Sequence, residues 1–346
     1  MGEEATARYR LGERIGGGGM AEVFEGTLVG AEGFARPVAV KRMLPQLSSD
    51  PTFGQMFINE ARIASLLHHA NIAGVLDFDR DEQGRYFLVM ELIQGVDLRQ
   101  LMDTGRLPVP VSVHIAAEML RGLSYAHELE QDGRRLGIVH RDISPHNVMV
   151  SWDGAVKLVD FGIAKALAAT GISRTGTIKG KLAYMSPEQA GALELDGRSD
   201  LFAVGVVLHE LLTGDRLFRG STEPEVLARV LTQPIPRPSE LAPDVDPQLD
   251  AVVLRMLERD RDQRYADAHQ ALDALLATPA STSRGSLELE RTLVERFPGR
   301  ARRRSTHSGV KGRRTPSPSP AGAVPQVGPL EAAVRARPAG ASTPAG

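Results

Sequence analysis

Apolar residues along the first part of the chain follow two periods, which predict strands and one helix in a fixed order. Residues 9–44 alternate short apolar runs with glycine and polar turns, a pattern typical of consecutive strands. Residues 53–67 carry apolar side chains at helical spacing, and residues 86–91 form a short apolar run that favours a buried strand. This part of the chain is therefore expected to form a small sheet with one helix.

Helical periodicity dominates the next part of the chain. It predicts helices over 110–129, 200–214, 249–259 and 267–277. Asp97 is an N-cap type residue in front of a further helix. The strongly apolar run 200–214 is too short to cross a bilayer and is expected to be a buried core helix. The sequence thus predicts an α+β protein, with a small antiparallel sheet lobe followed by a larger, mostly helical lobe.

From residue 278 the apolar periodicity nearly disappears, and proline, serine, alanine, glycine and arginine dominate. Residues 278–346 contain 12 lysines and arginines but only 4 acidic residues, whereas the whole chain has a formal net charge of -2. Such a segment buries too little apolar surface to offset its chain entropy, so we expect a disordered basic tail with at most one short helix over 287–297. Without interleaved aromatic residues, a solvated tail is favoured over binding to nucleic acid or an acidic membrane.

The amino-acid composition limits which metal sites and which cellular compartment are expected. The chain has no cysteine, which excludes disulfides and thiolate metal sites and fits a reducing compartment. Its acidic first residues lack the apolar region of a secretory signal, and no run is long enough for a membrane span. We therefore expect a cytoplasmic protein.

The most informative stretch is the polar loop 140–147, between an apolar helix and a strand-like run. It contains Asp142 and, five residues later, Asn147. Asp160 follows the next apolar run, in the sequence Asp-Phe-Gly. Two carboxylates and an amide on neighbouring turns are suited to binding a divalent metal and accepting a proton.

The glycine run 16–19 lets backbone amides approach an anion closely, although a flexible hinge is the default interpretation of such a run. A dinucleotide-binding fold is excluded because strand-like residues, rather than a helix, follow the glycines. A P-loop is excluded because Gly-Lys-Ser/Thr is absent. Lys41 ends the next strand, and Glu60 lies within the predicted helix 53–67.

In this order and spacing, these motifs resemble those of the protein kinases, in particular the bacterial, eukaryotic-like serine/threonine kinases. The resemblance covers about residues 9–277, with the lobes divided near residue 93: an N-lobe over 9–93 and a C-lobe over 94–277. It implies ATP and Mg²⁺ as cofactors and proteins with serine or threonine acceptors as substrates. It also allows a homodimer for autophosphorylation in trans, whereas nucleic acid is not expected as a partner.

The resemblance also assigns roles to residues. Asp142 would accept the proton of the acceptor hydroxyl, Lys41 would pair with Glu60 and hold phosphates, and Asn147 and Asp160 would bind the metal. The remaining positions assigned to the nucleotide site are Ile15, Gly16, Gly17, Gly18, Gly19, Met20, Ala21, Val23, Ala39, Met90 (as gatekeeper), Glu91, Ile93 and Met149. Asp200 would brace the catalytic loop, and Arg264 would pair with Glu188.

Two positions depart from the pattern of serine/threonine kinases. Ser144 stands where a lysine is usual, and Lys181 stands where a threonine is usual. We expect Lys181 to supply the missing cation as a catalytic residue; the alternative is two unrelated changes. The loop also lacks the arginine that tyrosine kinases carry there, which favours serine/threonine specificity. A pseudokinase scaffold is the alternative function.

The segment 160–188 has the length of a kinase activation segment and contains several hydroxyl residues. We expect phosphorylation at Thr175 or Thr177 to activate the protein, with Arg141 as the partner of the phosphate.

Overall fold

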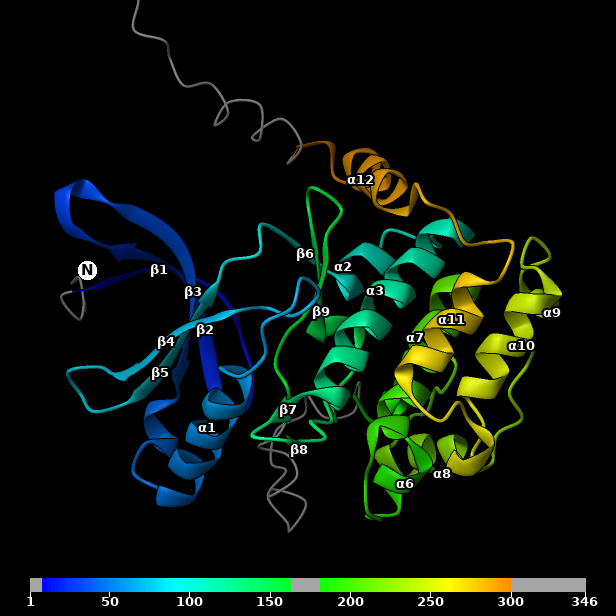
Figure 1. Cartoon of the computed structure of the whole chain (residues 1–346), viewed down its shortest axis with the longest axis horizontal. Helices are drawn as coiled ribbons and strands as arrows, with labels where there is room; N and C mark the ends of the chain where they lie inside the picture. Colours follow the sequence, from blue (N-terminus) through cyan, green and yellow to red (C-terminus); the bar gives the residue numbers. More distant parts are fainter. Residues whose placement is uncertain (1–7, 163–180, 300–346) are drawn as a thin grey trace, which may run out of the picture. The chain divides into compact units, whose positions relative to one another are not determined.

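The computed structural model describes residues 8–162 and 181–299, which form a sheet-containing lobe and a mostly helical lobe (Figure 1). The N-terminal lobe contains an antiparallel sheet with the strand order β1-β2-β3-β5-β4. Its strands are β1 (Tyr9–Gly17), β2 (Ala21–Val29), β3 (Ala35–Met43), β4 (Val75–Arg80) and β5 (Tyr86–Glu91). The predicted small sheet is confirmed.

Alternation along β3 gives the sheet two different faces, because successive side chains of a strand point to opposite sides. Val38 and Val40 belong to one apolar cluster, whereas Met43 packs with Phe57 on the other face. Phe57 belongs to α1 (Pro51–Ala64), which begins where the Asp50 side chain accepts a hydrogen bond from the Thr52 amide. Lys41 has the same parity as Met43, so it faces the side of the sheet that α1 covers.

The C-terminal lobe is mostly helical, as the periodicity predicted. Its helices are α2 (Leu98–Met102), α3 (Val109–Glu128), α6 (Pro187–Ala190), α7 (Gly197–Thr213), α8 (Glu223–Thr232), α9 (Pro238–Leu241), α10 (Pro247–Met256), α11 (Ala268–Leu276) and α12 (Gly285–Arg296). Helix α7 is buried along most of its length and packs against α3, α10 and α11. Asp97 caps α2 as predicted, because its carboxylate accepts a hydrogen bond from the Gln100 amide.

A three-stranded sheet lies at the junction of the lobes and carries the loops of the predicted site. Its order is β10-β9-β6, with β6 (Gly95–Asp97), β9 (Val148–Ser151) and β10 (Val156–Leu158). The β9–β10 hairpin returns the chain beside its start, so that the Val159 amide donates to the Asn147 carbonyl at 3.0 Å. A parallel bridge between Ile72 and Leu158 links this sheet to the N-terminal lobe. A two-stranded ribbon, β7 (Glu130–Gln131) and β8 (Arg134–Arg135), follows α3.

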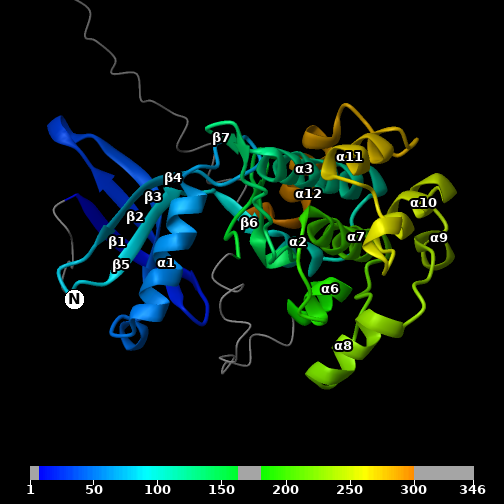
Figure 2. The same cartoon turned by 60° about the horizontal axis from the view of Figure 1, so that its bottom comes forward.

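Packed structure continues beyond residue 277, where the sequence predicted the start of a disordered tail. Helix α12 packs against α3 (Figure 2), and Leu289 and Leu293 are fully buried in the main core. The Phe297 ring lies edge-on to Trp152, with 5.7 Å between ring centroids. The short helix that the sequence allowed over 287–297 is present as α12. The prediction of disorder was wrong for residues 278–284, which lead into this helix, because the buried leucines of α12 anchor it on the core.

None of the helices within the two described segments is both long enough and apolar enough to span a membrane.

Candidate active site

Three separate segments bring Lys41, Glu60 and Asp160 together. Lys41 Nζ lies 2.5 Å from Glu60 Oε1 and 2.9 Å from Asp160 Oδ1. The side chains of Lys41 and Glu60 are only 13% and 12% exposed, so each charge depends on the other for compensation. The predicted ion pair is present, and it places the carboxylate that follows β10 beside the amine from β3.

The charges of Lys41 and Asp160 hold each other in their ionised forms. Burial alone would lower the pKa of Lys41, but the nearby charges of Asp160 and Glu60 outweigh it and raise that pKa. Burial would raise the pKa of Asp160, but the charge and hydrogen bond of Lys41 lower it below the usual range. For Glu60, burial prevails over the Lys41 charge and raises the pKa. Asp160, with a side chain 38% exposed, is thus an accessible carboxylate at neutral pH.

The catalytic-loop residues Asp142 and Asn147 contact each other directly. The Asn147 side-chain amide donates to the backbone carbonyl of Asp142 at 2.7 Å and to its Oδ2 at 2.8 Å. Lys181 Nζ lies 2.8 Å from the same Oδ2. The side chain of Asp142 is 11% exposed. Lys181 therefore contacts the predicted catalytic carboxylate, and the buried Ser144 Oγ has no hydrogen-bond partner within the described residues.

The backbone is strained at Arg141 in this loop and at Asp160 in the next one, and Asp200 of α7 fixes the first of these loops by hydrogen bonds. Arg141 has a φ of 66° and Asp160 a φ of 56°, both in the left-handed region that non-glycine residues rarely adopt. The Asp200 carboxylate accepts hydrogen bonds from the amides of His140 and Arg141 at 2.8 and 2.9 Å. It also bonds to His127 Nε2 at 2.8 Å. Asp200 thus braces the loop as predicted. Several hydrogen bonds to one short segment can maintain a strained backbone conformation.

Gly162 fixes the distance between the two acidic loops. Its amide donates to the His140 carbonyl at 2.8 Å, and a Cβ at this position would approach the Cβ of Asp142 to 2.8 Å. Any larger residue would force these loops apart. Asp142 and Asp160 therefore belong to one site rather than to two cavities.

The strand registers place several of the predicted nucleotide-contact residues around this cluster. Val23 lies opposite Lys41 across β2 and β3, and Ala39 lies opposite Met90 across β3 and β5. Between β1 and β2, the Gly18 amide donates to the Ala21 carbonyl at 2.8 Å, and a Cβ on Gly18 would meet nothing within 4 Å. The glycine turn thus leaves open space for an anion.

Three further residues predicted to contact the nucleotide differ in exposure and in the hydrogen bonds that they already make. Met149 pairs with Asp97 between β9 and β6, and Ile15 is 50% exposed on β1. The Glu91 amide already donates to the Gly74 carbonyl at 2.9 Å, and its carboxylate pairs with Lys157. The backbone N–H of Glu91 is therefore not available to adenine.

Sequence reasoning missed two contacts around the site, one to the catalytic loop and one to α7. The Gln189 side chain donates to the Arg141 carbonyl at 2.9 Å, and the Tyr184 hydroxyl donates to the buried Glu210 at 2.8 Å. Both contacts span more than twenty residues of sequence, and no local pattern signals them. The predicted pair of Arg264 and Glu188 is present, with two hydrogen bonds of 2.7 and 2.8 Å. Thr175 and Thr177 lie outside the described residues.

Comparisons with known proteins agree with this geometry. The sequence model of the protein kinase domain matches residues 9–276. The tyrosine-protein kinase MasK of Myxococcus xanthus is 42% identical over 273 residues, which cover 77% of this chain and 42% of MasK. The serine/threonine-protein kinase PknL of Mycobacterium tuberculosis is 39% identical over 264 residues, covering 76% of this chain and 63% of PknL. The serine/threonine-protein kinase PknB of Mycolicibacterium smegmatis is 39% identical over 273 residues, which cover 77% of this chain and 42% of PknB.

Among solved structures, the kinase domain of Mycobacterium tuberculosis PknI aligns with a TM-score of 0.59 at 26% identity, over 80% of this chain and 98% of that domain. The chain spans only about 42% to 63% of the length of the curated relatives named above. The two-lobed kinase fold predicted from the sequence is confirmed. Because the family match covers most of the chain and the matched motifs converge on one site, this chain belongs to the protein kinase family.

Proposed function

We propose that this protein is a serine/threonine protein kinase that transfers the γ-phosphoryl group of ATP to hydroxyl groups of proteins in a Mg²⁺-dependent reaction. The observation that carries the proposal is the convergence of Lys41, Asp142 and Asp160, which come from three segments, in one hydrogen-bonded site. Phosphoryl transfer depends mainly on positioning and charge neutralisation, and these residues are suited to both.

Each residue has a distinct task in this proposal. Lys41, held by Glu60, binds the α- and β-phosphates through its charged amine. Asp142 orients the acceptor hydroxyl and takes its proton through a carboxylate that Asn147 and Lys181 hold in place. The open turn at Gly18 and its neighbouring glycines covers the phosphates with backbone amides.

The donor set fits a magnesium ion. Asp160 and Asn147 provide a carboxylate and an amide oxygen, and Mg²⁺ typically binds one or two such protein groups together with phosphates and water. Bound Mg²⁺ would neutralise charge on the transferred phosphoryl group. The ionised state of Asp160, maintained by Lys41, supports this assignment.

The acceptor amino acid is the part of the proposal on which the relatives' names differ. PknL and PknB are named serine/threonine kinases, whereas MasK is named a tyrosine kinase. The absence of arginine from residues 143–146 favours serine and threonine. Tyrosine is the second candidate, and it is favoured by the 42% identity to MasK.

The test measures transfer of labelled phosphate from ATP to matched peptides that differ only in a serine, threonine or tyrosine acceptor. We expect transfer to serine and threonine with Mg²⁺, and a loss after chelation of the metal. Asp142→Asn should remove transfer, because it removes the proton acceptor while keeping the size of the side chain. Transfer to tyrosine alone would contradict the serine/threonine assignment.

A pseudokinase is distinguished in the same experiment. It would bind nucleotide but give the same background signal in the wild type and in Asp142→Asn. The substrates, a cytoplasmic location and a homodimer that phosphorylates itself in trans are parts of the same proposal. Mapping phosphorylated sites after incubation with ATP tests the autophosphorylation.

A further inference from the structure

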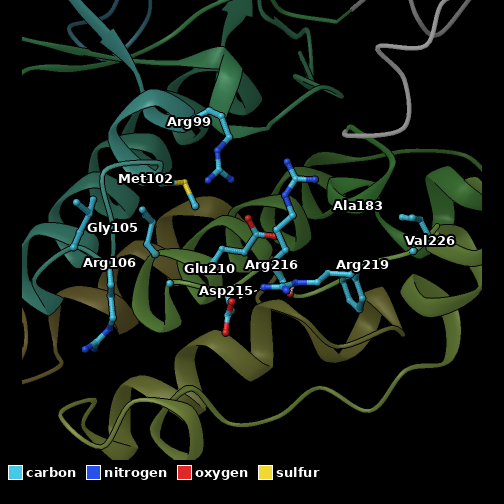
Figure 3. Close-up of a pocket in the computed structure, with 15 residues that line it drawn as sticks. Arg99, Met102, Gly105, Arg106, Ala183, Glu210, Asp215, Arg216, Arg219 and Val226 are labelled. Atoms are coloured by element: carbon cyan, nitrogen blue, oxygen red, sulfur yellow. Dashed lines mark hydrogen bonds and ion pairs between the residues drawn. The ribbon is translucent and has the colours of Figure 1, made fainter. Parts of the chain in front are cut away.

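A cavity of about 510 Å³ lies in the C-terminal lobe between the end of α7 and residues of α2 and α8. Four arginines and two acidic residues line it: Arg99, Arg106, Arg216 and Arg219, and Glu210 and Asp215. Figure 3 shows Arg99 and Arg216 on either side of Glu210. We propose that this cavity binds an anionic side chain of the protein substrate, close in sequence to the acceptor hydroxyl. The proposal rests on the proposed kinase function and adds a class of substrate to it.

The cavity is connected to the candidate active site by a very short piece of chain. Lys181 contacts Asp142, and Ala183, two residues later, lines the cavity. The Tyr184 hydroxyl then donates to Glu210, another lining residue. Because two residues span at most about 7 Å, the cavity lies within a few peptide residues of a hydroxyl placed at Asp142. A substrate segment in extended conformation can therefore occupy both at once.

The balance of charges leaves the cavity positive. Glu210 is buried, and its carboxylate is already committed to the Tyr184 hydroxyl and the Leu217 amide. Burial also raises the pKa of Glu210, which weakens its competition with an incoming anion. Asp215 is paired with Arg219. The two acids of the lining are thus occupied.

Arg216 is the arginine most open to a ligand. Arg99 pairs with Asp103 and Arg106 with Asp244, but Arg216 is exposed and makes no ion pair with any residue in 8–162 or 181–299. A guanidinium group without a partner gains two parallel hydrogen bonds from a carboxylate or phosphate. A lysine or arginine of the substrate would be repelled at the same place.

Binding of labelled peptides to the full chain without ATP tests this inference. The peptides share a serine acceptor and carry one neighbouring glutamate, glutamine or phosphoserine, which is moved one residue at a time along the sequence. Fluorescence anisotropy should give an affinity about two- to fivefold higher for the glutamate than for the glutamine peptide at one position, as expected for an exposed ion pair. The phosphoserine peptides distinguish a phosphate from a carboxylate as the preferred anion.

Arg216→Gln should abolish the preference for the anionic peptide. Arg229→Gln is the matched control, since Arg229 is a half-exposed arginine of α8 that does not line the cavity. Arg216→Glu should reverse the preference toward a peptide with lysine at the same position. In phosphorylation assays, Arg216→Gln should raise KM for the anionic peptide with little change in kcat, because the residue binds substrate without touching the reacting atoms.

Equal affinity of the wild type for glutamate, glutamine and phosphoserine peptides at every position would overturn the inference, as would an equal effect of Arg216→Gln and Arg229→Gln. This outcome is separate from failure of the proposed function. The binding measurement contains no ATP, so a chain that prefers anionic peptides but transfers no phosphate would contradict only the kinase proposal. Phosphate transfer without any anion preference would contradict only the cavity's role.

Discussion

At the scale of single residues, the contact between Lys181 and Asp142 is the feature that most distinguishes this site from the usual kinase pattern. Lys181→Ala removes the amine 2.8 Å from Asp142 Oδ2. We expect kcat to fall more than about tenfold, which corresponds to about 1.4 kcal/mol of transition-state stabilisation. Steady-state phosphorylation of a serine peptide measures this change.

A reciprocal variant tests whether Lys181 replaces a lysine at position 144. Ser144 is buried within the catalytic loop, and its hydroxyl makes no hydrogen bond within the described residues, so a change there breaks no such bond. The double variant Ser144→Lys, Lys181→Thr should recover at least part of the activity that Lys181→Ala loses. If Lys181→Ala alone keeps nearly full kcat, the amine has no catalytic role.

The sequence predicted the single-residue features that lie within short motifs. Asp142 and Asn147 are five residues apart, and their contact follows from one tight loop. The partnership of Lys41 and Glu60 required the family resemblance, because it joins a strand to a helix. The shared position of Arg99 and Arg216 at one cavity could not be predicted, since it depends on how α2 lies relative to the segment that follows α7.

At the scale of elements, α12 is the part of the structure that the sequence analysis underestimated. Its apolar positions are few and lie among charged residues, so a pattern search finds only a weak helix. The structure buries two of them, Leu289 and Leu293, in the same core as α3. Local periodicity cannot predict this packing, because the surface that α12 covers is formed by helices distant in sequence.

Two leucines of α12 provide a matched test of this docking. Leu289 is 0% exposed and Leu287 is 44% exposed on the same helix. Leu289→Ala should lower the free energy of unfolding by about 2 to 5 kcal/mol, because it leaves a cavity in the core. Leu287→Ala should change it by less than about 0.5 kcal/mol. Equal effects in urea unfolding would show that α12 does not dock.

The ion pair that ties α6 to the segment before α11 gives a pH-dependent prediction. Glu188 accepts two hydrogen bonds from Arg264 and one from Ser199 at 2.6 Å. Burial would raise the pKa of Glu188, but these partners outweigh it and hold the pKa below its usual value of 4.5. Because the folded state favours the ionised form, this stabilisation is complete above about pH 4.5 and is lost as the pH falls through the lower folded-state pKa.

Glu188→Gln should therefore lower the free energy of unfolding most at neutral pH, by on the order of 3 to 5 kcal/mol, because it leaves the buried Arg264 without its counter-charge. The difference in unfolding free energy between wild type and variant should shrink as the pH falls below about 4.5. Urea unfolding at several pH values measures it. A difference that stays constant with pH would mean that the carboxylate charge is not what stabilises the contact.

At the scale of the whole molecule, the proposed nucleotide site uses groups from both lobes, since Lys41 belongs to the N-terminal sheet and Asp160 follows the β9–β10 hairpin. A ligand that binds only the folded state stabilises it, by about 2.7 kcal/mol at one hundred times its Kd. ATP with Mg²⁺ should therefore raise the unfolding temperature of the full chain. Asp160→Asn should remove the metal-dependent part of this increase while leaving a smaller effect of ATP alone, because Lys41 and the glycine turn remain. An unfolding temperature that responds equally to ATP with and without Mg²⁺ in the wild type would exclude Asp160 as a metal ligand, and it would do so independently of any measured phosphate transfer.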